Sequence, residues 1–326
     1  MNIGVIGGGA WGTALAQVAA AGGRECLLWA LETEVVESIN GRRKNSVFLP
    51  GIGLANGVRA TSNLADLATC HALLVVTPAQ HMRSVLEQLP SCVQPLILCA
   101  KGIEEKSGAL LHDVAREICP SAPIAVLSGP TFAHEVARGL PTAVTLAAED
   151  AALAEQLRER LAQPAFRIYV SDDVAGAEIG GAVKNVLAIA CGVVEGKGLG
   201  QNARAALISR GFAEMTRFGL ACGAKRETLA GLSGLGDLVL TCSSTSSRNY
   251  SLGKGLGEGR SAADLMADRR TVAEGAFTAP VLARLALDKG VDMPIVDAVA
   301  ALIAGRSSVD EVLSALLSRP PRAEAV

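Results

Sequence analysis

A glycine-rich turn near the N-terminus constrains the fold of this chain more than any other feature. Residues 3–6 have the pattern of a short buried strand, and Gly7, Gly9 and Gly12 follow with the spacing G-x-G-x-x-G before an alanine-rich helical stretch. In this context the first glycine permits a tight turn, the second lets a ligand approach the backbone, and the third lets helix and strand pack closely. A helix N-terminus attracts phosphate, so the sequence predicts a dinucleotide site here. The alternative is a glycine turn that binds no ligand.

The N-terminal half of the chain has the pattern of an α/β domain. With 326 residues, the chain has the length of two domains at roughly 150 residues each. Short strands alternate with helices in this half, as in a mainly parallel, doubly wound Rossmann-like sheet. The strands are expected over residues 3–6, 26–29, 73–76, 96–99, 124–127, 143–146 and 166–170. The helices between them are expected over residues 11–21, 32–39, 81–89, 110–118 and 151–161.

From residue 174 onward the sequence is rich in alanine, leucine and valine and shows few strand signals. Helical periodicity without strands predicts an all-α domain. Its helices are expected over residues 174–194, 203–220, 249–256, 277–286 and 296–303. We therefore expect a dinucleotide-binding Rossmann domain over residues 1–175 and a helical substrate-binding domain over residues 176–326.

Composition excludes several classes of partner. The 30 lysines and arginines against 32 aspartates and glutamates leave a formal net charge of −2, and aromatic residues make up 3% of the chain. Such a chain has no overall positive field and few stacking surfaces, so it is not expected to bind nucleic acid or an anionic membrane. Its apolar runs fall short of the roughly 20 residues that span a bilayer, and residues 1–6 lack the basic start of an export signal. We therefore expect a cytoplasmic protein without a membrane span.

The cysteines and histidines indicate no metal site. The eight cysteines form no C-x-x-C pair, and the four histidines have neither ligand spacing nor an obvious paired base. Buried thiols in a reducing compartment are the favoured interpretation, although an even number of cysteines leaves a bridge open. The cysteines are Cys26, Cys70, Cys92, Cys99, Cys119, Cys191, Cys222 and Cys242.

Glu32 is a candidate for the adenosine end of a dinucleotide. It follows the second predicted strand, about 20 residues after the last turn glycine, where a carboxylate commonly accepts the ribose hydroxyls of NAD. An ordinary surface glutamate at a helix start explains it equally well. Arg42, Arg43 and Lys44 could serve the 2′-phosphate of NADP or could simply face solvent. These residues leave the choice between NAD and NADP open.

Lys184 is the candidate proton donor. A reductase that uses a nicotinamide needs a group that protonates the developing alkoxide, and Lys184 borders an apolar helical stripe. The residues four and three positions before it are Gly180 and Gly181, and we expect the missing side chains to leave a hollow for a small substrate. A lysine that extends its ammonium to solvent is the alternative. Asp237, in a glycine-rich segment, either approaches a ligand or caps a helix.

Polar residues at predicted turns suggest a phosphate site. Ser247, Arg248 and Asn249 combine an N-cap hydroxyl, a guanidinium and an amide at a predicted helix start, and these groups suit phosphate oxygens. A polar surface turn is the alternative. Lys101 and residues 128–131 follow predicted strands, at the sheet edge where such folds bind ligands.

Together these residues resemble the bacterial NAD(P)-dependent glycerol-3-phosphate dehydrogenases. The similarity is carried by specific strings in both predicted domains. They are GGGAWGTALA at 7–16, NSVFLPG at 45–51, AKG at 100–102, SGPTFA at 128–133, GLPTAV at 139–144, GGAVKNVLAI at 180–189, GLGDLVLTC at 234–242, SRN at 247–249 and VAEG at 272–275.

This resemblance implies a homodimeric enzyme that interconverts dihydroxyacetone phosphate and sn-glycerol 3-phosphate with NAD(P)H and supplies glycerol 3-phosphate for phospholipid synthesis. It makes Lys184 the catalytic proton donor or acceptor. The residues implied to contact the substrate are Lys101, Gly129, Thr131, Lys184, Asp237, Ser247, Arg248 and Asn249. Those implied to contact the cofactor, besides the turn glycines and Glu32, are Ala10, Trp11, Lys101, Ala133, Arg248, Val272 and Glu274.

The sequence departs from the family at one position. Members often have a basic residue just after the second strand, where it meets the 2′-phosphate of NADP, whereas this chain has Leu31 and Glu32 there. We therefore favour NAD as the cofactor, and use of both NAD and NADP stays open. Two other functions also stay open. One is a related dehydrogenase for a β-hydroxy acid or ketopantoate, which would need to recognise a carboxylate, and the other is a sensor that binds the cofactor without turnover.

Overall fold

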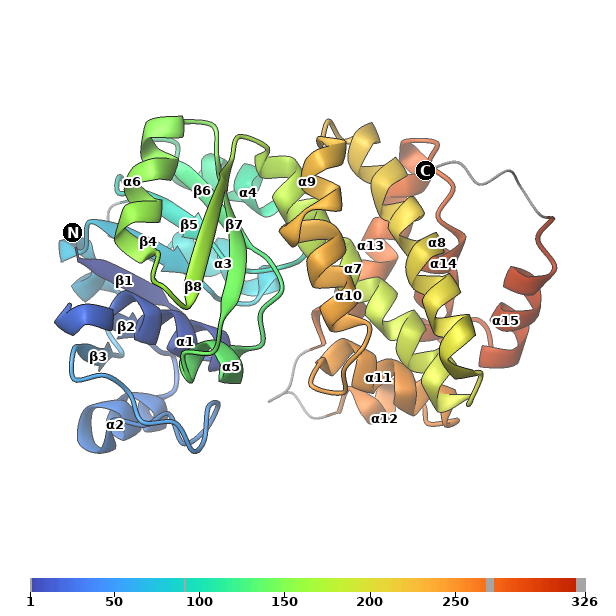
Figure 1. The fold of residues 1–326 in the computed structure, drawn as a ribbon, viewed down its shortest axis with the longest axis horizontal. Helices are drawn as coiled ribbons and strands as arrows, with labels where there is room; N and C mark the ends of the chain where they lie inside the picture. The colour runs from blue at the N-terminus through green and yellow to red at the C-terminus, as the bar shows by residue number, and fades with distance from the viewer. Residues whose placement is uncertain (1, 91, 268–272, 321–326) are drawn as a thin grey trace. The chain divides into compact units, whose positions relative to one another are not determined.

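The computed structural model describes residues 2–90, 92–267 and 273–320, which form two compact units. The first unit extends to Ala100 and resumes over Leu111–Val174, and it contains the strands drawn in Figure 1. The second unit consists of Lys101–Leu110 and the described residues from Ala175 onward. The sequence pattern assigned residues 101–110 to the N-terminal domain, whereas the structure places them in the second unit. The division of function at residue 175 stays a prediction.

The first unit is built on one eight-stranded sheet. Its order is β3-β2-β1-β4-β5-β6-β7-β8, and every neighbouring pair is parallel except β6 with β7. The mainly parallel, doubly wound arrangement predicted from the sequence is therefore confirmed. The strands are β1 (Ile3–Ile6), β2 (Cys26–Trp29), β3 (Val58–Thr61), β4 (Ala72–Val75), β5 (Leu96–Leu98), β6 (Ile124–Ser128), β7 (Thr142–Ala148) and β8 (Phe166–Ser171).

The sequence pattern does not predict the edge strand β3. Its four residues alternate between the core and solvent, and the exposed Arg59 interrupts the apolar signal. Pairing with β2 is what makes the segment a strand. The helical segments of the first unit are α1 (Ala10–Ala19), η1 (Ala21–Gly23), α2 (Thr33–Arg42), η2 (Leu64–Thr69), α3 (Ala79–Leu86), α4 (Leu111–Ile118), α5 (Ala133–Ala137) and α6 (Ala151–Leu161).

The described part of the second unit is helical apart from residues 101–110 and short connections, so the predicted all-α domain is confirmed. Figure 1 shows these helices in yellow-green to red. They are α7 (Val174–Gly196), α8 (Gly200–Ala221), α9 (Arg226–Ala230), η3 (Leu232–Gly236), α10 (Asp237–Thr241), α11 (Arg248–Gly257), α12 (Ala262–Leu265), α13 (Glu274–Asp288), α14 (Pro294–Ile303) and α15 (Val309–Leu317).

Helix α7 supplies much of the core of the second unit. With 23 residues it has the length and apolar composition of a membrane span, so the expectation that every apolar segment is too short is wrong. Its most apolar window is, however, entirely buried in the structure. Ile179, Val183 and Val186 are fully buried among apolar side chains of the other helices. The apolar character of α7 is therefore used for packing within the protein.

Helices α7 and α11 approach each other through glycines. A Cβ on Gly192 would lie 2.1 Å from the carbonyl oxygen of Tyr250, and one on Gly253 would lie 1.9 Å from that of Ile189. Any side chain at these positions would push the two helices apart. The close crossing determines where α11 begins relative to α7.

Residues 101–110 are held in the second unit by its core. Ile103 is fully buried in the apolar cluster of the helices. The side-chain amide of Asn185, on α7, donates to the carbonyl oxygen of Lys101 at 3.4 Å. These contacts fix the backbone from which the side chain of Lys101 extends.

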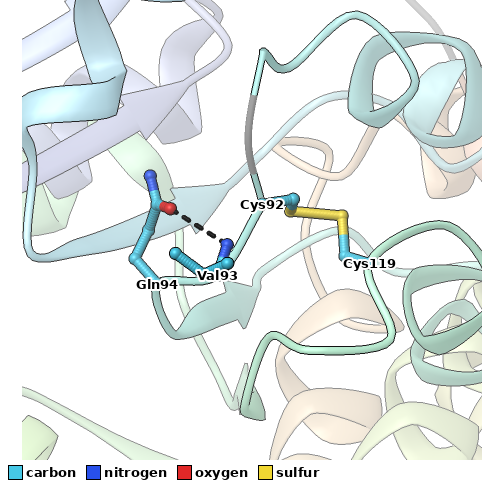
Figure 2. The surroundings of a disulfide bond; sticks show 4 residues. All are labelled: Cys92, Val93, Gln94 and Cys119. Carbon is cyan, nitrogen blue, oxygen red and sulfur yellow. Dashed lines mark hydrogen bonds between the residues drawn. A yellow bond between two sulfur atoms is a disulfide. The ribbon is translucent and has the colours of Figure 1, made fainter.

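Cys92 and Cys119 form a disulfide in the first unit, as Figure 2 shows. Cys92 lies in the loop before β5, Cys119 directly follows α4, and their Cα atoms are 5.4 Å apart. The interpretation of all eight cysteines as buried thiols is therefore wrong for this pair. The two residues are 27 positions apart, and only packing of α4 beside the loop brings them together. Of the free cysteines that the structure describes, Cys222 is half-buried and the others are buried.

Candidate active site

The glycine turn has the shape expected of a dinucleotide site. Gly7 leaves β1 with a φ of 123°, which glycine adopts far more readily than other residues. A Cβ on Gly12 would lie 1.9 Å from the carbonyl oxygen of Gly7, so α1 packs directly on the turn. A Cβ on Gly9 would meet nothing within 4 Å, which leaves this side of the turn open. No side chain caps α1, so its first N–H groups remain for an anion, and these residues fit a bound diphosphate.

Buried polar atoms without a partner lie along the same edge of the sheet. Within the described residues, Nε1 of Trp11, Oγ1 of Thr77 and Oγ of Ser128 are buried and make no hydrogen bond. They lie at or just beyond the carboxyl ends of β1, β4 and β6, which run parallel to one another. Buried polar groups are normally paired in folded proteins, so these three atoms are candidates for contacts with a ligand.

Glu32 lies where the sequence predicts it, just after β2 and at the N-terminal end of α2. Its side chain is exposed and makes no capping hydrogen bond. Arg42 and Lys44 are also exposed, and the guanidinium of Arg43 donates to the side chain of Asn56. An acidic group at the start of α2 and basic groups at its end are therefore exposed, and the preference for NAD over NADP stays a prediction.

Two lysines converge on one buried carboxylate in the second unit. Asp237 is fully buried, and its Oδ2 accepts from Nζ of Lys101 at 2.6 Å while its Oδ1 accepts from Nζ of Lys184 at 3.0 Å. Nζ of Lys184 also donates to Oγ1 of Thr241 at 2.8 Å. Lys184 is only 7% exposed, so the alternative of a lysine extended to solvent is wrong. The alternative in which the side chain of Asp237 caps a helix N-terminus is also wrong, because Asp237 is the first residue of α10, its N-cap is Gly236, and no side chain makes a capping hydrogen bond there.

Burial and neighbouring charges shift the pKa values of Lys184 and Asp237. Burial lowers the pKa of Lys184 to about 8, since desolvation disfavours the ammonium, and the nearby Lys101 acts in the same direction while Asp237 opposes it. Burial by itself would raise the pKa of Asp237, but the two ammonium groups outweigh this effect and hold the pKa below its usual value. The cluster thus combines an ionised carboxylate with a lysine that can gain or lose a proton close to neutral pH.

The space beside Gly180 is filled by protein. A Cβ on Gly180 would lie 2.5 Å from the carbonyl oxygen of Ser233 and 2.9 Å from Cα of Gly234. The expected substrate hollow at this position is therefore wrong. The missing side chain instead lets η3 approach α7, and η3 leads directly into Asp237. Gly180 thus helps to bring the carboxylate to Lys184.

A chain of amides links the lysine cluster to α11 and α13. Besides the bond from Asn185 to Lys101, Nδ2 of Asn249 donates to Oδ1 of Asn185 at 2.9 Å. The backbone N–H of Gly275 donates to Oδ1 of Asn249, also at 2.9 Å. The structure therefore brings Lys101, Lys184, Asp237 and Asn249 together, as expected if they share one site.

The N-terminus of α11 combines a cap with an exposed guanidinium. Oγ of Ser247 accepts from the N–H of Tyr250 at 3.2 Å, which confirms the predicted N-cap. Arg248 is exposed, and its guanidinium has no partner among the residues that the structure describes. A free guanidinium beside a helix N-terminus suits a phosphate group, although the role itself stays a prediction.

The remaining predicted site residues are distributed over both units. Gly129, Thr131 and Ala133 belong to the first unit, where they lie at the end of β6 and the start of α5. Glu274 is the first residue of α13, next to the glycine of the amide chain. Val272 lies outside the described residues. Contacts of these residues with a ligand stay predictions.

Thr241 and Asn45 make hydrogen bonds at the lysine cluster and at the glycine turn, but the sequence pattern did not identify either as a site residue. The hydroxyl of Thr241 donates to Oδ1 of Asp237 at 3.2 Å, one turn along the same helix, and this i, i+4 spacing was a usable signal. Asn45 donates to the carbonyl oxygen of Gly8 and to the side chain of Thr13. Apart from lying in a family-like string, Asn45 has no local feature that points to the glycine turn.

The described residues contain no group of three or more histidine, cysteine, aspartate and glutamate side chains that could hold a metal ion. His112 lies 3.2 Å from its neighbour Asp113, and His71 accepts from the backbone N–H of Asn2 at 3.0 Å. These two histidines make local structural contacts.

Comparison with known proteins gives a consistent family match over both units. Residues 2–154 match the family model for the NAD-dependent glycerol-3-phosphate dehydrogenase N-terminus, and residues 173–314 match the model for the C-terminus. The chain is 66% identical over 323 residues to a glycerol-3-phosphate dehydrogenase (NAD(P)+) from Erythrobacter litoralis, with 99% of this chain and 98% of the relative covered. It is 63% identical over 323 residues to one from Sphingopyxis alaskensis, with the same coverage.

A solved structure shows the same similarity in three dimensions. The crystal structure of glycerol-3-phosphate dehydrogenase from Coxiella burnetii superposes with a TM-score of 0.93 at 37% sequence identity. The match covers 98% of this chain and 99% of that one. Both units of the chain thus have counterparts in that fold.

Proposed function

Since the chain belongs to the NAD-dependent glycerol-3-phosphate dehydrogenase family, we propose that it interconverts dihydroxyacetone phosphate and sn-glycerol 3-phosphate at the cluster of Lys101, Lys184 and Asp237. The chain is an oxidoreductase that uses NAD or NADP, as the names of its relatives state. The observation that carries the choice of site is the fully buried carboxylate shared by two ammonium groups. A sensor without turnover would need no such group.

The glycine turn and the N-terminus of α1 are proposed to hold the cofactor diphosphate, with Glu32 on the adenosine ribose. The open side of Gly9 and the uncapped helix start support this assignment. When bound, NAD(P)H supplies the hydride that the carbonyl carbon of the substrate receives. By resemblance, further proposed contacts to the cofactor are Ala10, Trp11, Lys101, Ala133, Arg248, Val272 and Glu274.

Lys184 is proposed to move the proton. As the carbonyl carbon is reduced, its oxygen gains negative charge, and the ammonium of Lys184 donates a proton to it. In the oxidation direction the neutral amine takes the proton from the substrate hydroxyl. Asp237 and Thr241 accept hydrogen bonds from Nζ, so they hold this nitrogen in one position and keep the charged form accessible.

The pH dependence of the two directions tests this role. Reduction requires protonated Lys184 and oxidation requires the neutral amine, and the pKa of this lysine is about 8. We therefore expect kcat/KM for dihydroxyacetone phosphate to fall as pH rises through about 8, and kcat/KM for glycerol 3-phosphate to rise through the same region. Initial rates between about pH 6.5 and about pH 9.5, with stability checked by preincubation at each pH, measure both curves. Flat profiles across this interval would contradict proton transfer by Lys184.

Arg248 is proposed to bind the substrate phosphate together with Asn249. Replacing Arg248 with alanine removes an exposed guanidinium that has no partner among the described residues, so the fold should be retained. We expect KM for dihydroxyacetone phosphate to rise by about 10- to 100-fold, with a smaller change in kcat, because a charged hydrogen bond to phosphate is lost. Steady-state kinetics with dihydroxyacetone phosphate and with unphosphorylated dihydroxyacetone measure the effect. An unchanged preference for the phosphorylated substrate would exclude Arg248 from the phosphate site. Arg260→Ala, which also replaces an exposed arginine, is the matched control.

Several further properties of the enzyme are proposed. The substrate contacts of Gly129, Thr131 and Ser247, the homodimer and the supply of glycerol 3-phosphate for phospholipid synthesis follow the family resemblance. The cytoplasmic location, and the division into a dinucleotide-binding domain over residues 1–175 and a substrate-binding domain over residues 176–326, follow the sequence pattern. The preference for NAD over NADP rests on Glu32 in place of a basic residue.

A further inference from the structure

We propose that Asn45 is a positioning residue that aims the backbone of the glycine turn at the cofactor diphosphate, an inference that rests on the proposed use of this turn for the cofactor. Asn45 is fully buried in the loop that follows α2. Its Nδ2 donates to the carbonyl oxygen of Gly8 and to Oγ1 of Thr13, both at 2.8 Å. Its Oδ1 accepts from the N–H of Phe48 at 3.0 Å, which anchors the amide on its own loop.

The hydrogen bond from Asn45 to the Gly8 carbonyl determines the direction of the Gly9 N–H. Because a trans peptide is planar, the carbonyl of Gly8 and the N–H of Gly9 point in opposite directions. Asn45 holds the Gly8 carbonyl toward the protein, so the Gly9 N–H is directed away from Asn45. This N–H donates to no acceptor among the described residues, and a Cβ on Gly9 would meet nothing within 4 Å. Asn45 therefore leaves the Gly9 N–H as a backbone donor that makes no hydrogen bond within the described residues.

The turn needs an external group to hold it in this way. Gly7, Gly8 and Gly9 have no side chains, and consecutive glycines have the largest conformational freedom to lose on ordering. Within the turn region, the hydroxyl of Thr13 also approaches the Gly8 carbonyl, but at 3.4 Å, which is a weaker contact than that of Asn45. Asn45 is thus the principal side-chain donor to the peptide that joins Gly8 to Gly9.

Two substitutions at position 45 and one control test this role. Asn45→Asp keeps the shape of the side chain and its acceptor but replaces the donor with a carboxylate beside the Gly8 oxygen, and Asn45→Ala removes both groups. The control is Asn40→Asp, because the amide of Asn40 also bonds backbone groups, donating to Ala60 at 2.8 Å and accepting from it at 2.9 Å, without contacting the turn. Dissociation constants for NADH are measured by nicotinamide fluorescence, and those for ADP-ribose by competition. Thermal unfolding of each variant without ligand is recorded alongside.

We expect both Asn45 variants to bind NADH and ADP-ribose about 10-fold more weakly or worse, since a preorganised donor to the diphosphate is lost. KM for dihydroxyacetone phosphate and kcat at saturating NADH should stay within about twofold of wild type, because Asn45 lies outside the lysine cluster. Asn40→Asp should bind NADH like wild type. If both folded Asn45 variants bind NADH like wild type while their melting temperatures fall, the role is structural and the inference is overturned. If the wild-type protein binds neither NADH nor NADPH, the proposed function fails instead, which is a distinguishable result.

Discussion

Lys184→Ala is expected to lower kcat by about 100- to 10,000-fold in both directions while the dissociation constant for NADH stays unchanged. The substitution removes the group that exchanges a proton with the substrate oxygen, and general acid–base catalysis contributes a factor of this size. The remaining pair of Lys101 and Asp237, with Nζ and Oδ2 2.6 Å apart, keeps the buried carboxylate compensated, so the protein should still fold. Steady-state rates and NADH fluorescence titrations measure the two quantities.

Two further variants separate loss of the proton donor from general damage. Lys184→Met fills the space with a side chain of similar length and should be equally inactive. Lys254→Ala, on α11, removes a partly exposed lysine whose ion pair within the described residues is with Glu258 at 3.9 Å, and it should leave turnover intact. Addition of a small primary amine to Lys184→Ala should restore part of the lost rate, since the amine can occupy the vacated position. Near-normal turnover in Lys184→Ala would exclude this lysine from the mechanism.

Asp237→Asn is expected to reduce both stability and turnover. The change preserves the shape of the side chain but leaves Lys101 and Lys184 facing each other without the carboxylate, which is 0% exposed. Removing one partner of a buried ion pair typically costs about 3–5 kcal/mol in the free energy of unfolding. Because Asp237 raises the pKa of Lys184 electrostatically, its loss should move that pKa below the wild-type value of about 8. The pH midpoint of glycerol 3-phosphate oxidation should therefore shift downward.

The stability loss should depend on pH with a defined sign. In the variant, Lys184 has a lower pKa in the folded state than in the unfolded state, so the unfolded state binds more protons in the interval between the two values. The free energy of unfolding of the variant must then rise with pH across that interval. The wild type shows the same rise above about 8, where its own Lys184 loses the proton, so the destabilisation relative to wild type should shrink between the pKa of the variant and about 8. Urea unfolding at several pH values measures this dependence. Asp310→Asn is the control, because Asp310 pairs with Lys197 at an exposed position. If Asp237→Asn destabilises the protein no more than this control does, the charge argument is refuted.

The sequence by itself determined those features whose structure depends only on residues close to one another in the chain. The glycine turn between β1 and α1 was predictable because its glycine spacing, the strand before it and the helix after it all lie within a few turns of chain. Residues such as Ser247 were predictable as an N-cap for the same reason, since the capping bond to Tyr250 spans three residues. The identification of the family also depended on short strings of this kind. Lys184 could be selected from its position on an apolar helix, although the space beside Gly180, part of the expected hollow, is filled by η3.

Only the tertiary structure decided how the distant parts of the site combine. Lys101 and Asp237 are 136 residues apart in the chain, and Lys101 reaches the carboxylate because residues 101–110 are packed into the second unit by Ile103. The contact of Gly180 with η3, the disulfide of Cys92 and the bond from Asn45 to Gly8 are likewise set by packing. Hydrogen bonds and ion pairs of this type form between residues that are close only after the cores have formed. No short-range pattern records such proximity, because burial and backbone approach depend on the whole fold.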